Sequence, residues 1–230
     1  MLSLSNLDSF YGRSQALHDV SMSAPSGTIL AVLGRNGVGK TTLLRSILGL
    51  TDRQSGDVVL DGQNISADAT YRRARAGIAY VPQGRMIIPD FTIRENILMG
   101  GFAAQGPRAI PKIVPKIFPY LMENLDRPGG VLSGGQQQQL AIARALANGP
   151  KVLLMDEPTE GIQPNIVEQI EDIIIRLNAE LGLTILLVEQ NVKFARRAAQ
   201  NFTMLENGRV VADGAIADLT EETVTKHMAI

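Results

Sequence analysis

Two adjacent segments give the strongest indication of the fold: Thr28-Ile-Leu-Ala-Val-Leu33, and then Gly34-Arg-Asn-Gly-Val-Gly-Lys40-Thr41. The first is a continuous apolar run, which is typical of a strand buried on both faces. The second matches the pattern G-x-x-x-x-G-K-[ST], and the segment Lys40–Leu50 that follows it has its leucines on one helical face. The order strand, glycine-rich turn and helix predicts a loop that binds nucleotide phosphates.

The chemistry of such a loop follows from its residue types. Glycines allow the backbone N–H groups to turn inward around phosphate oxygens, and the next helix adds the positive end of its dipole. Lys40 supplies a charge to the β- and γ-phosphates, and the Thr41 hydroxyl is a ligand for Mg²⁺. The alternative is a glycine turn that precedes a lysine by chance, which occurs in about 1% of chains of this length. The residues expected to bind the nucleotide here are Gly34, Asn36, Gly37, Gly39, Lys40, Thr41 and Thr42.

Further strands alternate with helices along the chain. Ile78–Val81, Val152–Met155 and Thr184–Val188 are short apolar runs, and the spacing of isoleucines in 166–177 predicts a helix between the last two. This alternation predicts an α/β fold with a mainly parallel sheet. The alternating residues of 2–23 and the turn Asn207-Gly208 predict additional antiparallel strands.

The segment from about 85 to 145 has a different pattern. It shows no convincing strand, and Pro107, Pro111, Pro115 and Pro119 recur every four residues. A continuous helix is excluded there, because each interior proline costs about 3 kcal/mol. We expect a helical insert with a proline-rich start and short helices near 116–125 and 135–147. The insert divides a core made of about 1–84 and 146–230.

Two acids end the strand at 152–155. At the carboxyl edge of a parallel sheet Asp156 would face the ligand crevice and hold Mg²⁺, and Glu157 would activate the attacking water as general base. Two solvated acids that merely cap a loop are the alternative. The phosphate loop and this pair also fit many other nucleotide hydrolases. No N-K-x-D stretch is present to read guanine, but a small-molecule kinase stays open at this point.

Leu132-Ser-Gly-Gly-Gln136 precedes a helical segment and lies twenty residues before Asp156. With the other motifs it makes nearly the whole chain resemble the ABC-type ATPases, which have a RecA-like P-loop core, an antiparallel β subdomain and an inserted α-helical subdomain. A plain helix cap would explain Ser-Gly-Gly alone, but not five motifs in the order of the family. The resemblance implies that Ser133, Gly135 and Gln136 bind the γ-phosphate of a nucleotide held by a partner subunit.

The same resemblance assigns roles to two further residues, and the sequence departs from the usual pattern of the family at two positions. Tyr11 corresponds to the aromatic residue that stacks on adenine, with core packing as the alternative, and Gln83 to the glutamine at the Mg²⁺ and water site. The histidine that the family usually has after the strand 184–188 is replaced by Gln190, and the usual aspartate after Glu157 by Gln163. Gln190 can still donate an amide N–H to phosphate, and we expect it to be catalytic.

Both departures resemble importers of branched-chain amino acids, urea and short-chain amides. Tyr71–Arg85, Ser133–Ile142 and Asp156–Pro164 look most like the urea transporter ATPase, so urea or amide import is the leading expectation and branched-chain amino acid import the alternative. The resemblance implies a companion ATPase subunit, two transmembrane permease subunits and an external substrate-binding protein. The subunit would be peripheral, at the cytoplasmic face of the inner membrane.

Composition is compatible with this expectation. The formal net charge of −1 gives no basic field for nucleic acid, and the chain contains no cysteine. The start carries no basic segment followed by a long apolar one, so a secretory signal is not expected. Two rival interpretations are an ABC ATPase that acts away from membranes and a nucleotide-gated module that does not hydrolyse ATP, the latter because of Gln163 and Gln190.

Overall fold

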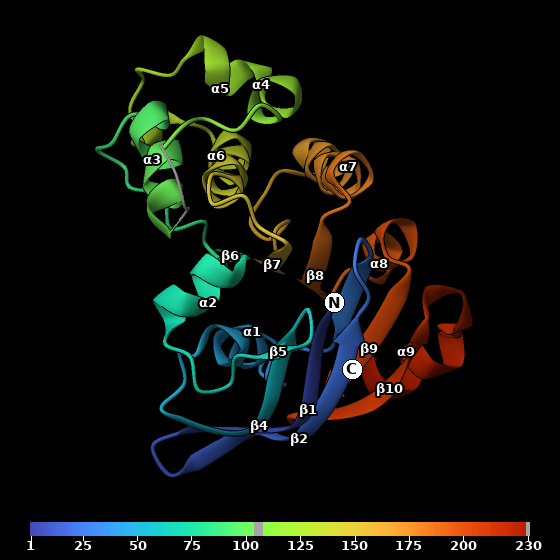
Figure 1. Cartoon of the computed structure of the whole chain (residues 1–230). Coiled ribbons are helices and arrows are strands. Elements are labelled where there is room, and N and C mark those ends of the chain that lie inside the picture. Colours follow the sequence, from blue (N-terminus) through green and yellow to red (C-terminus); the bar gives the residue numbers. More distant parts are fainter. Residues whose placement is uncertain (104–107, 229–230) are drawn as a thin grey trace.

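Two β-sheets organise the chain, which a computed structural model describes over residues 1–103 and 108–228 (Figure 1). The larger sheet has the strand order β10-β9-β3-β8-β7-β6, and the smaller has the order β2-β1-β4-β5. The strands of the larger sheet are β3 (Ile29–Leu33), β6 (Ile78–Val81), β7 (Val152–Asp156), β8 (Thr184–Glu189), β9 (Asn201–Glu206) and β10 (Arg209–Ala215). Those of the smaller sheet are β1 (Leu2–Tyr11), β2 (Ser14–Ala24), β4 (Arg53–Leu60) and β5 (Gln63–Asn64).

The larger sheet is parallel except at one edge. Strand β3 lies between β8 and β9, and β7 lies between β6 and β8, all in parallel pairs. Strand β10 pairs antiparallel with β9 through the expected hairpin. Every residue of β3, β7 and β8 is buried, which explains why these strands are continuous apolar runs in the sequence. The predicted α/β fold with a mainly parallel sheet is confirmed.

Helix α1 (Lys40–Leu48) packs between the two sheets. Its buried side chains, Leu43, Leu44 and Ile47 among them, share one apolar core with the smaller sheet. Alternate residues of β3 divide between this core and a second one, because neighbouring side chains on a strand point to opposite faces. Leu30 and Val32 face α1, whereas the other three residues of β3 face the helices on the far side of the sheet.

The segment between β6 and β7 is helical, and its helices lie in the upper part of Figure 1. They are α3 (Ile93–Gly100), α4 (Val114–Ile117), α5 (Pro119–Glu123) and α6 (Gly134–Leu146). Pro115 lies in the first turn of α4 and Pro119 begins α5, positions that lose no helical hydrogen bond. The helix expected near 116–125 is therefore two short helices, while α6 matches the one expected at 135–147. Pro107 lies outside the described residues.

Helix α7 (Pro164–Leu181) follows β7 and buries the predicted isoleucine face against the large sheet. The other helices are α2 (Thr70–Ala76), α8 (Val192–Ala198) and α9 (Glu221–Met228), with 3₁₀ turns at Gly101–Ala103, Gly129–Val131 and Ile216–Asp218. Within residues 1–103 and 108–228, no helix has the length and apolar character needed to cross a bilayer. Because β3, β7 and β8 are parallel, the residues that follow them meet at one edge of the sheet.

Candidate nucleotide-binding and catalytic site

The glycine-rich loop joins β3 to α1 at this edge. A Cβ atom on Gly34 would lie 2.5 Å from the carbonyl oxygen of Leu205, so no other residue fits without displacing backbone. Gly39 immediately precedes α1 and has φ +108°, a conformation that L side chains rarely adopt. The geometry of the loop thus depends on these two glycines, as the sequence pattern predicts.

Lys40 is buried, and its ammonium group makes three contacts. Its Nζ donates to the carbonyl oxygens of Gly34 and Arg35, both at 2.9 Å, and lies 3.0 Å from Glu157 Oε1. A lysine has three N–H donors, so all of them are engaged inside the site. The arrangement fixes the charge at the centre of the loop, where phosphate oxygens would be held.

Asp156 ends β7 with only 1% of its surface exposed. Its carboxylate accepts a hydrogen bond from Thr41 Oγ1 at 3.2 Å and one from the Tyr80 hydroxyl at 3.1 Å. Burial raises the pKa of Asp156, an effect that the two hydrogen bonds oppose. Tyr80 is not predicted from the sequence, because a tyrosine inside a buried strand has no motif that marks it.

Glu157 adopts a left-handed backbone conformation, with φ +45°. Its backbone N–H donates to the carbonyl oxygen of Val188 at 3.0 Å, which ties the end of β7 to β8. Its carboxylate accepts a hydrogen bond from Gln190 Nε2 at 3.1 Å, and the same amide donates to Asn36 Oδ1 at 2.6 Å. The structure thus brings together residues from the glycine-rich loop, the end of β7 and the end of β8.

Gln83 follows β6 and is exposed, and its side-chain amide donates to the carboxylate of Glu160. It lines one cavity of about 390 Å³ together with the glycine-rich loop and Glu157. The cavity also includes five residues that the motifs do not mark: Gln15, Ala16, His18, Asn207 and Gly208. Tyr11 lies half-buried at the end of β1 and is not among the lining residues.

The Ser133–Gln136 segment lies at a different place. Ser133 caps α6, since its hydroxyl accepts from the Gln136 N–H while the Gln136 side chain accepts from the Ser133 N–H. Ser133, Gly135 and Gln136 line a separate cavity with residues of α5 and α7. A Cβ on Gly135 would approach Ile166 Cγ2 to 2.4 Å, so this glycine lets α6 pack closely on α7. This cavity shares no lining residue with the one that holds Lys40.

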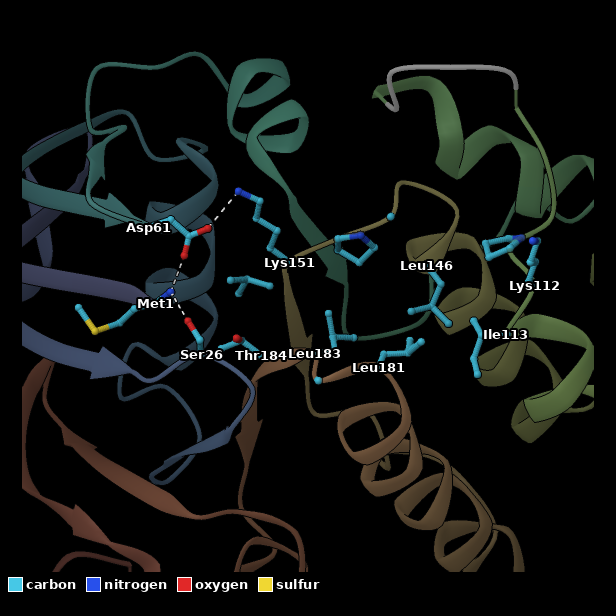
Figure 2. A pocket seen from close by; sticks show the side chains of 15 residues that line it. Met1, Ser26, Asp61, Lys112, Ile113, Leu146, Lys151, Leu181, Leu183 and Thr184 are labelled. Carbon is cyan, nitrogen blue, oxygen red and sulfur yellow. Dashed lines mark hydrogen bonds and ion pairs between the residues drawn. The ribbon is translucent and has the colours of Figure 1, made fainter.

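A cavity of about 580 Å³, larger than the one that holds Lys40, lies at the opposite edge of the sheet, where β7 and β8 begin (Figure 2). Figure 2 shows the Met1 amino group and Lys151 on either side of Asp61, while Leu146 and Leu183 line an apolar wall. The amino group and Lys151 hold the pKa of Asp61 below its usual range. None of the residues expected to bind nucleotide lines this cavity, so size does not identify the site here.

Comparison with known proteins identifies the family of the chain. The family model described as ABC transporter matches residues 17–160, more than half of the chain. The chain belongs to the ABC transporter family. It is an ABC-type ATPase, and the core, the β sheet of the amino-terminal part and the helices between β6 and β7 have the architecture expected for one.

Two curated relatives match this ABC ATPase over nearly its full length. The high-affinity branched-chain amino acid transport ATP-binding protein BraG of Pseudomonas aeruginosa is 41% identical, covering 97% of each chain. The probable branched-chain amino acid transport ATP-binding protein LivF of Archaeoglobus fulgidus is 39% identical, covering 96% of this chain and 94% of the relative. A solved bacterial ABC transporter cassette, determined as a dimer, is 27% identical with a TM-score of 0.79, covering 94% of this chain and 99% of its own.

Proposed function

We propose that this ABC ATPase supplies the energy for import of branched-chain amino acids. The observation that carries the proposal is the full-length similarity to BraG and LivF, which are both described as branched-chain amino acid transport proteins. From the sequence, urea or amide import is the leading expectation and branched-chain amino acid import the alternative. These relatives support the alternative better, since neither of them is described as a urea or amide transporter. No residue of an ATPase subunit is expected to touch the cargo.

For hydrolysis, each residue of the site has one proposed task. Lys40 holds the β- and γ-phosphates, and Gln190 donates its amide N–H to the γ-phosphate. Thr41 and Asp156 present hard oxygen ligands 3.2 Å apart, a pair that fits Mg²⁺, with Gln83 as the third ligand of the proposed set. Bound there, Mg²⁺ would neutralise charge on the phosphate oxygens. Glu157 takes a proton from the attacking water.

The second half of each site is proposed to come from another cassette. Ser133, Gly135 and Gln136 stand at the start of a 13-residue helix, whose free N–H groups and dipole favour an anion. Because they line a cavity separate from Lys40 in this chain, they would serve a nucleotide on the facing subunit. A companion ATPase or a second copy of this chain would fill that place, with residues 85–145 acting as a helical subdomain against the core.

A groove between the core and the helical segment is the proposed contact with the permease. It is formed by α1 and α2 on one side and by α3 and α6 on the other. Leu50 and Met99 line it with 50% and 38% of their surfaces exposed, so apolar area is available for a partner helix. Two permeases and an external substrate-binding protein would complete the importer. The ATPase would then be peripheral, at the cytoplasmic face of the membrane.

The experiment that tests this function is uptake of labelled leucine and labelled urea in a strain that lacks the subunit. Complementation with the wild-type chain should restore leucine uptake, and complementation with Lys40→Ala should not. Restored urea uptake with unchanged leucine uptake would overturn the cargo proposal while leaving the ATPase assignment intact.

A further inference from the structure

The carboxylate of Glu189 lies at the end of β8 with only 4% of the residue exposed. It is not in the cavity that holds Lys40 and Glu157, and no motif marks it. One of its oxygens accepts a hydrogen bond from the Thr159 hydroxyl at 2.9 Å. The other accepts from the backbone N–H groups of Gln190 and Asn191, at 3.2 and 3.4 Å.

These bonds connect two loops that carry proposed catalytic groups. Thr159 belongs to the loop that follows β7, two residues after Glu157. Gln190 and Asn191 form the loop between β8 and α8. Glu157 and Gln190 also meet directly, at 3.1 Å between Oε1 and Nε2. A shift of Glu189 would therefore displace both members of that pair.

We propose that Glu189 is a positioning residue for ATP hydrolysis, which holds Gln190 against Glu157 by bonding to both loops. The proposal rests on the catalytic tasks proposed above for Glu157 and Gln190. Glu189 does not line the cavity that holds Lys40 and Glu157, so it acts only through the residues that it holds.

A carboxyl group at this place is costly. Burial raises the pKa of Glu189 to about 7, with the negative charge of Glu157 adding to the effect, although all three hydrogen bonds oppose it. A buried apolar side chain would avoid the desolvation cost but would leave the Gln190 and Asn191 N–H groups without this acceptor. The carboxyl is therefore suited to fixing loop geometry rather than to maximising stability.

The test uses the full chain and, first, three single variants at positions 159 and 189. Glu189→Leu removes both acceptors. Thr159→Val removes one bond from the other loop with almost no change of shape, and so should fold normally. Glu189→Gln keeps all three bonds, since its oxygen accepts from the two N–H groups and its amide donates to the Thr159 hydroxyl.

The first readout is amide signals and exchange rates from NMR of the ¹⁵N-labelled chain. In Thr159→Val, a change in the loop after β7 should shift the signals of Gln190 and Asn191, and in Glu189→Leu their exchange should accelerate at least about 10-fold. Unchanged signals at these two amides in Thr159→Val would overturn the proposal. This readout does not depend on what Gln190 does in catalysis.

The second readout is ATP turnover with Mg²⁺. We expect Thr159→Val and Glu189→Leu to lower kcat about 10-fold with KM for ATP nearly unchanged, and the double variant to be no worse than Glu189→Leu. Glu189→Gln should recover most of kcat. A double variant whose loss of kcat equals the two single losses combined would contradict the positioning role. An equal loss of kcat in Glu189→Gln and Glu189→Leu would contradict it as well. Wild-type turnover in Gln190→Ala would instead overturn the catalytic task proposed for Gln190.

Discussion

The Nζ atom of Lys40 lies 3.0 Å from Oε1 of Glu157, and both side chains are almost fully enclosed. The cation proposed to hold the phosphates is thus paired with the carboxylate proposed to activate water. A phosphate group and Glu157 compete for the same ammonium group, and the phosphates also repel the carboxylate. ATP binding should therefore release Glu157 from Lys40, which leaves the carboxylate available as a base.

Replacement of Glu157 by Gln separates binding from hydrolysis. We expect ATP turnover to fall about 10²–10⁴-fold, because the general base is lost. ATP binding should persist and become tighter, since an amide does not repel phosphates and binds Lys40 less strongly. Phosphate release and nucleotide titration measure the two effects. Glu168→Gln, an exposed change on α7, is the matched control. Unchanged turnover in Glu157→Gln would remove Glu157 from the role of base.

Replacement of Gln190 by Ala should impair hydrolysis in the assembled complex by about 10²-fold, the typical loss for one donor aimed at a developing charge. Gln190→His, which restores the residue usual in the family, retains a donor and should keep much of the activity. The rate of a single turnover with the cognate partner is the measurement. A wild-type single-turnover rate in Gln190→Ala would show that Gln190 takes no part in hydrolysis.

Arg73 allows a stability prediction away from the site. Its guanidinium is buried and donates to the backbone carbonyls of Ser46 and Ile47 in α1, and also to those of Asp68 and Ser66. Arg73→Met should lower the free energy of unfolding by about 3 kcal/mol, because buried carbonyls lose their partners. Its neighbour Arg72 has a side chain that is 64% exposed, and Arg72→Met should change stability by less than about 0.5 kcal/mol. Urea denaturation of both variants measures the two changes in unfolding free energy. Equal losses in Arg73→Met and Arg72→Met would contradict the stabilising role of the buried guanidinium.

The raised pKa of Glu189 makes stability depend on pH. The folded state keeps the proton up to about pH 7, whereas the unfolded chain releases it near the ordinary value of 4.5. The folded state binds more protons in this window, so the contribution of Glu189 to stability falls as pH rises from about 4.5 to 7. The Glu189→Gln variant has no titrating carboxyl group at this position, so it lacks this pH-dependent contribution. Relative to wild type, the variant should gain about 3 kcal/mol of unfolding free energy between pH 4.5 and 8. A constant difference between the two proteins across this range would show that the pKa of Glu189 is not raised.

The sequence predicts most of the sheet but fewer of the helices. Strands β3, β7 and β8 are recognisable because they are buried on both faces. Helices α2 and α9 are not located by the apolar pattern, since α2 buries only Arg73 and α9 buries no side chain fully. A short helix with few buried residues has no clear period of 3.6.

The site shows the same division. Lys40 is predicted from the spacing of the glycine-rich loop, and Asp156 and Glu157 are predicted from their place directly after an apolar strand. Tyr80 and Glu189 act through contacts with residues 76 and 30 positions away, and spacing along the chain does not encode such contacts. His18 reaches the cavity because β2 runs beside the turn between β9 and β10, where the His18 N–H donates to the carbonyl oxygen of Gly208. The Gly208 N–H in turn donates to the carbonyl oxygen of Val38 in the glycine-rich loop.

In the proposed complex one cassette presents Lys40, and a facing one presents Ser133–Gln136, to the same ATP. Sedimentation of Glu157→Gln with ATP and Mg²⁺, alone and with the companion subunit, measures whether two cassettes share the nucleotide in this way. We predict a dimer that forms only with nucleotide and that is lost when Ser133→Arg is added. A chain that binds ATP yet sediments as a monomer in both mixtures would overturn the shared site.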